Sequence, residues 1–190
     1  FEATVSMGAP RLGCEAVPAK VPGVPAASEV LGWHLPAGFW QGLRAPEGWM
    51  QACGLEPTLS LVNMGNPHAV FWCASVQAVP LESVGPFIER HAWFPQRINA
   101  HFVEREGASA LRMRTWERGS GITMACGTGA SAVVVAAVRQ ARAASPVRVR
   151  LPGGELHIAW DGGETPVRMT GPAAHVASGT LGVELAREAG

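Results

Sequence analysis

The sequence has no cluster of basic residues and no net charge. Its 190 residues include 15 lysines and arginines, nearly all of them arginine and scattered along the chain, against 15 acidic residues. A nucleic-acid surface gathers basic side chains so that they can neutralise phosphates, and this scatter argues against such a partner. Hydrophobic residues make up 47% of the chain and charged residues 16%, which is typical of a well-buried globular protein.

Paired cysteines and spaced histidines of the kind that bind metals are also missing. The four cysteines, Cys14, Cys53, Cys73 and Cys126, include no C-x-x-C pair, and no two histidines have H-x-x-x-H spacing. Those spacings are typical of zinc ribbons, redox dithiols and many zinc enzymes. The chain is also too large and too rich in apolar residues to need disulfides. We therefore expect a reduced, cytoplasmic protein without a metal site.

No segment is long and apolar enough to cross a bilayer. The longest purely apolar run, residues 132–138, falls far short of the about 20 residues that a membrane helix needs. The first residues also lack the basic region and long apolar stretch of a signal peptide. They include no initiating methionine and begin directly with strand-like residues, so we expect a chain truncated at its N-terminus.

What the sequence does contain is a series of short β-rich runs around one strongly apolar helix. Strands are expected at 1–7, 58–64, 69–75, 100–104, 110–116, 147–151, 155–160, 166–169 and near 180–185, with helices at 81–91 and 128–142. The strand at 110–116 alternates, which places Arg112 and Arg114 on a solvated face. Residues 130–138 of the second helix are apolar on every side, so this helix must be buried. The sequence predicts an α+β fold, with a mostly antiparallel sheet curled around this helix.

A cysteine stands directly before the Gly-Thr-Gly turn that opens the buried helix. The first turn of a helix leaves backbone N–H groups unpaired and carries a partial positive charge, so it can bind a carboxylate, and Gly127 and Gly129 allow a close approach. The same field is expected to lower the pKa of the Cys126 thiol towards neutrality. A carboxylate held beside a thiolate predicts proton abstraction from the carbon alpha to that carboxylate.

The competing interpretation is that Cys126 only packs, as most cysteines in turns of small residues do. Other catalytic motifs do not explain the segment, because neither a P-loop nor a G-x-S-x-G elbow surrounds it. His68 has two interpretations as well: it either lines the site or packs against its own turn.

Several blocks, taken together, resemble the diaminopimelate epimerase family. Residues 125–129, Ala-Cys-Gly-Thr-Gly, and the preceding Trp-Glu-Arg-Gly at 116–119 resemble its second catalytic-cysteine motif. Residues 65–70 and 94–102 resemble its two asparagine segments, and residues 151–154 and 169–173 match its closing hairpin. The blocks occur in the family's order and span residues 5–181. The resemblance implies one near-complete domain of a pseudo-symmetric pair, and the echo between residues 5–10 and 62–67 fits two related halves.

The resemblance also implies a role for each matching residue. Cys126 would be one of two opposed cysteines, one acting as thiolate base and the other as thiol acid. The backbone N–H groups of Gly127 and Thr128 would bind the carboxylate at the reacting centre. The distal end of the substrate would be held by Asn66, Asn99 and Arg118. Glu117 would help to bind an amino group of the substrate. No cofactor and no metal is implied.

Two departures from the family pattern bear on activity. The N-terminal Cys-Gly-Asn-Gly-like motif that carries the other cysteine is missing, and Ile122 replaces a glutamate. Two-base epimerisation needs an acid on the opposite face, so we expect the chain alone to be inactive, with the absent N-terminal domain as its partner. The expected organisation is a terminal strand at 1–10 that belongs to or borders the N-terminal domain, a main domain at 11–181, and a tail at 182–190 that packs on the N-terminal domain.

The predicted function is the cofactor-independent interconversion of LL- and meso-2,6-diaminopimelate, which supplies lysine and cell-wall precursors. A proline racemase or hydroxyproline epimerase is the nearest alternative, but its substrate has one carboxylate and needs no distal clamp such as Glu117–Arg118. A non-catalytic remnant that binds amino acids or a partner subunit is the alternative from another class. We expect a small-molecule substrate and neither a membrane nor a nucleic-acid partner, and the sequence leaves a homodimer open.

Overall fold

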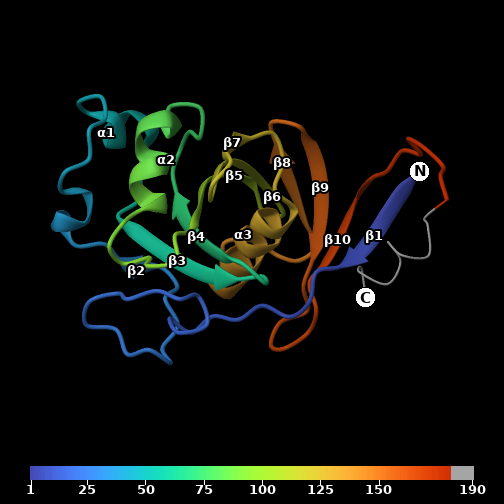
Figure 1. Ribbon diagram of the computed structural model, residues 1–190, viewed down its shortest axis with the longest axis horizontal. Coiled ribbons are helices and arrows are strands. Elements are labelled where there is room, and N and C mark those ends of the chain that lie inside the picture. Colours follow the sequence, from blue (N-terminus) through green and yellow to red (C-terminus); the bar gives the residue numbers. More distant parts are fainter. Residues whose placement is uncertain (181–190) are drawn as a thin grey trace.

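The computed structural model describes residues 1–180 as one strongly curved sheet with helices on both faces (Figure 1). In chain order the strands are β1 (Glu2–Ser6), β2 (Trp33–His34), β3 (Thr58–Asn63), β4 (Pro67–Trp72), β5 (Asn99–Gly107), β6 (Ala110–Glu117), β7 (Gly121–Thr123), β8 (Val147–Leu151), β9 (Gly154–Ala159) and β10 (Arg168–Pro172). The helices are the 3₁₀ turn η1 (Ala37–Trp40), α1 (Trp49–Cys53), α2 (Leu81–Glu89) and α3 (Gly127–Arg139).

The sheet is mixed. Its strands follow the order β1-β10-β9-β8-β6-β5-β4-β3-β2, and β7 pairs with β6 beside this path. The pairs β4–β5 and β6–β8 are parallel, whereas the other neighbours are antiparallel. Parallel neighbours need a crossover, and α2 and α3 are the helices in those two connections. The predicted α+β class, with a sheet around a central helix, is confirmed.

Helix α3 lies inside the curve of the sheet and contacts β3, β4, β5, β9 and β10 (Figure 1). All residues from Gly129 to Ala137 are buried. The strands face this helix with what we call the inner core, formed mainly by Val62, Val70, Trp72, Val103, Leu111, Val149 and Ile158. The valines of α3 are mediocre helix formers, so burial of about 1.5–3 kcal/mol per large apolar side chain holds the helix in place.

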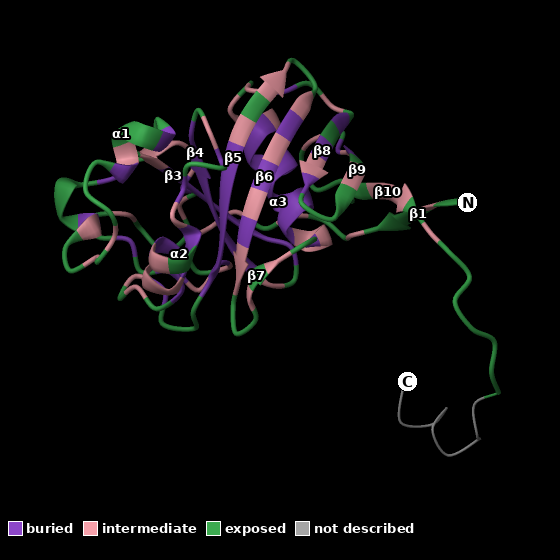
Figure 2. Ribbon diagram, turned by 90° about the horizontal axis from the view of Figure 1, so that it is seen from above, coloured by how far each residue is buried: buried purple, intermediate pink, exposed green. Residues whose placement is uncertain are grey.

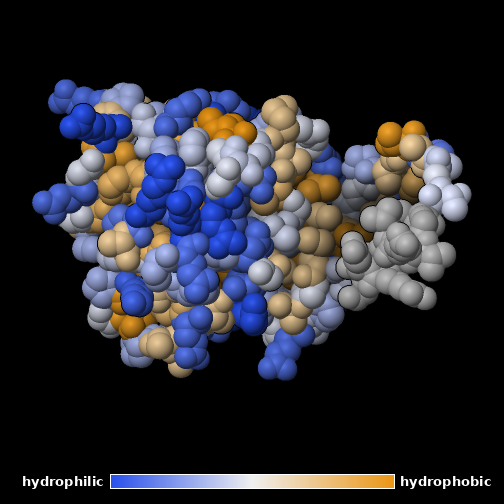
Figure 3. Space-filling model, viewed as in Figure 1, coloured by the Kyte–Doolittle hydropathy of each residue, from blue (hydrophilic) through white to orange (hydrophobic). Residues whose placement is uncertain are grey.

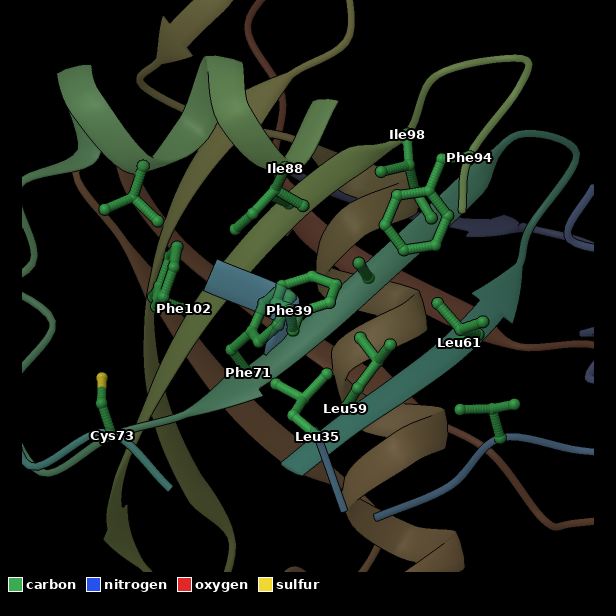
Figure 4. Close-up of a cluster of buried hydrophobic side chains, with 14 of the residues drawn as sticks. Leu35, Phe39, Leu59, Leu61, Phe71, Cys73, Ile88, Phe94, Ile98 and Phe102 are labelled. Carbon is green, nitrogen blue, oxygen red and sulfur yellow. The ribbon is translucent and has the colours of Figure 1, made fainter. Parts of the chain in front are cut away.

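The opposite face of the same strands carries a second cluster, the outer core, which α2 and the irregular segment 14–57 cover. Its members include Leu59, Leu61, Phe71, Ile88 and Phe102. Figure 4 shows the stacked rings of Phe71 and Phe102, whose centroids are 5.3 Å apart, beneath Ile88 of α2. Strand β4 is buried at every position, and its ribbon is purple in Figure 2. Its alternate side chains belong to the two cores.

Most of the predicted elements are found within two residues of their expected ends, but some expectations were wrong. The helix predicted to reach residue 142 ends at Arg139, and the short elements η1, α1 and β7 were not foreseen. Arg112 and Arg114 do not form a simple solvated face. Arg114 Nη1 donates to the carbonyls of Val76 and Val79, and Arg112 pairs with Glu106 at 2.6 Å. The strand expected near 180–185 lies almost wholly outside the described residues.

Strands β1 and β10 form a ribbon that projects from the body of the molecule (Figure 1). Phe1 is 83% exposed, and hydrophobic surface gathers at that end of the ribbon (Figure 3). Residues 1–10 are thus hydrogen-bonded to the sheet of the expected main domain. The domain boundaries at residues 10 and 181 stay a prediction, and the expected tail at 182–190 lies outside the described part of the chain.

Candidate active site

Cys126 is the residue directly before the first turn of α3. Its backbone is extended, with φ −145° and ψ 100°, and no side chain caps the helix. The N–H groups of the first turn therefore have no partner within the helix, as expected at any helix start. Cys126 is only 6% exposed, and its Sγ lies 3.7 Å from Thr128 Oγ1. The expected grouping of Cys126, Gly127 and Thr128 at a buried helix N-terminus is present in the structure.

The two glycines of this turn lie against neighbouring side chains. A Cβ on Gly129 would lie 2.4 Å from Cε1 of His101 and 3.0 Å from Sγ of Cys126. A Cβ on Gly127 would lie 3.0 Å from Sδ of Met169. Glycine at 129 thus lets the start of α3 pack directly on His101. Gly129 lies between the His101 ring and the Cys126 thiol.

The pKa of the Cys126 thiol is shifted upward, to about 11. Burial is the main cause, and the carboxylate of Glu117 adds to it, whereas hydrogen bonds from the Gly129 N–H and the Thr128 hydroxyl act in the opposite direction. The expectation of a lowered pKa was therefore wrong. Desolvation of the charged form outweighs the helix N-terminus here. At neutral pH the thiol of this chain is protonated, which makes it a proton donor.

Site-resolved alkylation of the chain tests this shift. We expect Cys126 to react with iodoacetamide more slowly than free cysteine between pH 7 and 9, with a rate that still rises above pH 10, because only the thiolate attacks. Peptide mass spectrometry separates Cys126 from the three other cysteines. Thr128→Ala, which removes a hydrogen bond to the thiolate, should slow the reaction further. A rate that levels off at or below the ordinary thiol pKa of about 8.5 would contradict the raised value.

Asn99 connects the two segments expected to hold the distal end of a substrate. Its Nδ2 donates to the carbonyl of Pro67 at 2.8 Å, and its Oδ1 accepts from the N–H of Arg118 at 2.9 Å. The side chain of Arg118 lies over the same region, with Nη1 donating to the Gln96 carbonyl at 2.9 Å. The structure therefore brings Asn99 and Arg118 together with the turn that carries Asn66.

The loop that carries Glu117 and Arg118 is anchored by a carboxylate that the sequence did not reveal. Glu89, at the end of α2, is buried and accepts from Trp116 Nε1 at 2.7 Å and from the N–H of Gly119 at 3.2 Å. Burial would raise its pKa, but these hydrogen bonds and the charges of Arg90 and Arg97 hold it below the usual value. An ionised Glu89 thus fixes both ends of the turn around Arg118.

A second feature that sequence reasoning missed is a line of buried polar side chains beneath the site. His68 Nε2 lies 2.8 Å from Asn66 Oδ1, His68 Nδ1 lies 2.8 Å from His101 Nε2, and His101 Nδ1 lies 2.9 Å from Thr115 Oγ1. Both histidines are fully buried. Of the two interpretations of His68, the contact with Asn66 and the full burial fit the one in which it packs against its own turn. The alternation of β5, which turns Asn99 and His101 to the same face, is the signal that could have identified His101.

Both histidines are neutral. Burial, followed by the positive charge of Arg118, lowers the pKa of His68 to about 3. Burial and the neighbouring His68 also lower the pKa of His101 well below its usual value. Ile122, in contrast, lies 41% exposed on β7 opposite Trp116, so the residue that replaces a glutamate faces away from the buried groups.

Residues 1–180 contain no group of three or more histidine, cysteine or acidic side chains placed to hold a metal ion. No helix in this part of the chain is long and apolar enough to cross a membrane.

Solved structures of other proteins share the fold of this chain. A predicted epimerase from Pseudomonas aeruginosa superposes with a TM-score of 0.53 over 90% of this chain and 55% of its own, at 16% identity. A hydroxyproline epimerase from Agrobacterium vitis, solved with bound trans-4-OH-L-proline, has a TM-score of 0.53 over 89% of this chain and 49% of its own, also at 16% identity. At such identities the likeness shows a shared architecture alone.

Comparison of sequences is more specific. Diaminopimelate epimerases from Cupriavidus necator and Ralstonia nicotianae are each 45% identical to this chain, over 95% and 98% of its length. The chain spans only 58% and 60% of the length of these two relatives. The family model described as diaminopimelate epimerase matches residues 60–176, which include every proposed site residue. The chain therefore belongs to the diaminopimelate epimerase family.

Proposed function

We propose that this chain supplies one catalytic face of an enzyme that interconverts LL- and meso-2,6-diaminopimelate by proton transfer between two cysteines. Cys126 is the cysteine that it contributes. The observation that carries the proposal is the buried thiol at the start of α3, which lies 3.7 Å from the Thr128 hydroxyl and beside the unpaired N–H donors of the first helical turn. A residue that only packs has no need of these donors, which favours chemistry over the remnant interpretation.

The N-terminus of α3 suits the reacting end of the substrate. A carboxylate bound by the N–H groups of Gly127 and Thr128 places the neighbouring α-carbon near Cys126. When the α-proton leaves, negative charge moves onto that carboxylate, where the helix N–H groups and their dipole stabilise it. No cofactor is needed if these groups supply the stabilisation.

The two directions of the reaction use Cys126 differently. As a protonated thiol it donates a proton to the planar carbanion that a base on the opposite face has formed. In reverse, Cys126 acts as the base and must first lose its own proton, and the Gly129 N–H and Thr128 hydroxyl are the groups that favour its anion. A partner thiol is required on the opposite face. Cys14, Cys53 and Cys73 all lie in the outer core, so the proposal requires one from outside the described residues.

The distal end of the substrate would bind where Asn66, Asn99 and Arg118 converge. Arg118 pairs well with a carboxylate because the guanidinium offers two parallel donors. A substrate that carries an amino-acid group at each end has two carboxylates. One would bind at the N-terminus of α3 and the other at Arg118. A proline-like substrate has a single carboxylate and would leave Arg118 without a partner.

Substitution of Arg118 in the full-length protein that contains this chain tests the function. We expect Arg118→Gln to raise KM for diaminopimelate about thirtyfold, because a charge-assisted hydrogen bond to the substrate is lost. Arg44→Gln, which removes an exposed arginine from the segment between η1 and α1, is the control and should leave KM unchanged. Racemisation of proline or hydroxyproline by the unaltered protein, with no turnover of diaminopimelate, would refute the proposal.

A further inference from the structure

The line of buried side chains Asn66–His68–His101–Thr115 has no part in the proton transfer proposed above. It joins β4, β5 and β6, and it passes directly under the first turn of α3, where Gly129 leaves room for His101. Four polar side chains in succession, at distances of 2.8 to 2.9 Å, form a complete hydrogen-bond chain. Such a chain transmits the orientation of one end to the other.

Neutral histidines make this chain directional. A neutral imidazole donates from one ring nitrogen and accepts at the other, so both rings must donate the same way along the line. If each ring carries its proton on Nε2, His68 donates to Asn66 Oδ1, His101 donates to His68 Nδ1, and the Thr115 hydroxyl donates to His101 Nδ1. Every group in the chain then has a partner.

The opposite direction leaves a buried hydroxyl without an acceptor. With both protons on Nδ1, Thr115 Oγ1 would accept from His101 and would have to donate elsewhere. Within residues 1–180 His101 is the one side-chain partner of this hydroxyl. A buried donor without an acceptor is costly, so Thr115 selects the first direction.

The direction of the chain decides what Asn66 presents to the site. When Asn66 Oδ1 accepts from His68, the two N–H bonds of the amide remain for a ligand. The positive charge of Arg118 acts on the same histidine, so both groups favour a ligand with acceptor oxygens. A carboxylate has such oxygens, whereas an ammonium group would meet only donors.

We propose that His101 and Thr115 are positioning residues, which fix the tautomer of His68 and thereby turn the amide N–H groups of Asn66 towards the substrate. In this orientation the Asn66 amide selects a carboxylate oxygen of the substrate. The identification of that carboxylate as the distal end of diaminopimelate rests on the proposed function. The tautomers and their control by Thr115 do not.

The tautomers can be measured by NMR on the ¹⁵N-histidine-labelled chain at neutral pH, from the two-bond couplings of each ring. We expect His68 and His101 to be neutral, with the proton on Nε2 in both. Protons on Nδ1, or a charged ring, would overturn the proposal. This result needs no variant and no substrate.

Two matched substitutions test the control by Thr115. Thr115→Val removes the hydroxyl that selects the direction, so a measurable share of the Nδ1–H tautomer should appear in both rings. Thr123→Val removes the buried hydroxyl of the residue paired with Thr115 on β7, which has no partner in the described structure, and should leave the tautomers unchanged. Tautomers that stay wholly Nε2–H in Thr115→Val, or that change equally in both variants, would overturn the role of Thr115.

Kinetics of the full-length protein connect the tautomer to the substrate. If the two directions become equally populated in Thr115→Val, half of the molecules present the wrong side of Asn66, and KM should rise about twofold with kcat unchanged. An unchanged KM in a variant with mixed tautomers would overturn the connection. An unaltered protein that turns over no diaminopimelate would contradict the proposed function and leave the NMR result standing.

Discussion

Cys126→Ala, introduced into the full-length protein that contains this chain, is expected to slow inversion of the α-carbon of diaminopimelate about a thousandfold. The loss should be equal in both directions, because each direction uses Cys126 once, as proton donor or as proton acceptor. The equilibrium between the LL and meso forms is a property of the substrate, so a variant cannot slow one direction more than the other. Chiral chromatography of the products, started from each isomer, measures both rates.

Cys73→Ala provides the matched control. Cys73 is also buried, but it lies in the outer core, where its thiol donates to the carbonyl of Val103. The same substitution there should alter stability while inversion per folded molecule persists. Inversion that survives in Cys126→Ala would mean that another group performs the proton transfer.

Gly129→Ala is expected to lower the free energy of unfolding of the chain by about 2 kcal/mol. The new methyl group would lie 2.4 Å from Cε1 of His101, which hydrogen bonds to His68 and Thr115 hold in place. Overpacking of this kind costs up to about 3 kcal/mol, and the better helix propensity of alanine offsets about 1 kcal/mol of it. Urea unfolding followed by circular dichroism gives the difference.

Gly127→Ala is the appropriate comparison, because it places the same methyl group in the same helical turn. Its nearest neighbour is Sδ of Met169 at 3.0 Å, at the flexible end of a side chain. A methionine can adopt another rotamer, so the loss should stay below about 1 kcal/mol. Equal losses for the two variants would show that His101 is free to move and that the packing under the helix is not rigid.

The sequence was sufficient to predict the element around which the site is built. The apolar run of α3 cannot be exposed on any side, so it predicted a buried helix. A glycine-rich turn before that helix, with Cys126 at its start, then predicted a site at the end of the helix. The buried helix is present in the structure, and both inferences were possible because each depends on residues that are adjacent in the chain.

The pKa of Cys126 could not be predicted in this way. Its direction depends on the balance between the N–H groups of the helix, which are local, and burial, which comes from strands distant in sequence. Glu89 was missed for the same reason, since an acidic residue at the end of an amphipathic helix ordinarily faces solvent. Trp116, the turn at Gly119 and Arg97 contact it, and all of them lie later in the chain.

Short elements were missed for a different reason. Strand β7 has three residues and begins with a glycine that has a φ of 78°, so neither its length nor its composition marks a strand. It exists because the edge of β6 that pairs with β8 at residues 110–112 is free again at residues 115–117, where β7 pairs. The hydrogen-bond partner determines the strand in such a case, and the partner cannot be identified from a single sequence.

The ribbon of β1 and β10 has a consequence for the order in which the chain is made and folded. Thr4 of β1 bonds to Thr170 of β10, 166 positions further along the chain. At a synthesis rate of about 5–20 residues per second, β1 waits roughly 10 to 30 s on the ribosome for its partner. During that time its edge is unpaired, as is the edge of any strand that precedes its neighbour. The ribbon needs β10, so it can form only after the other described strands and α3 have been synthesised.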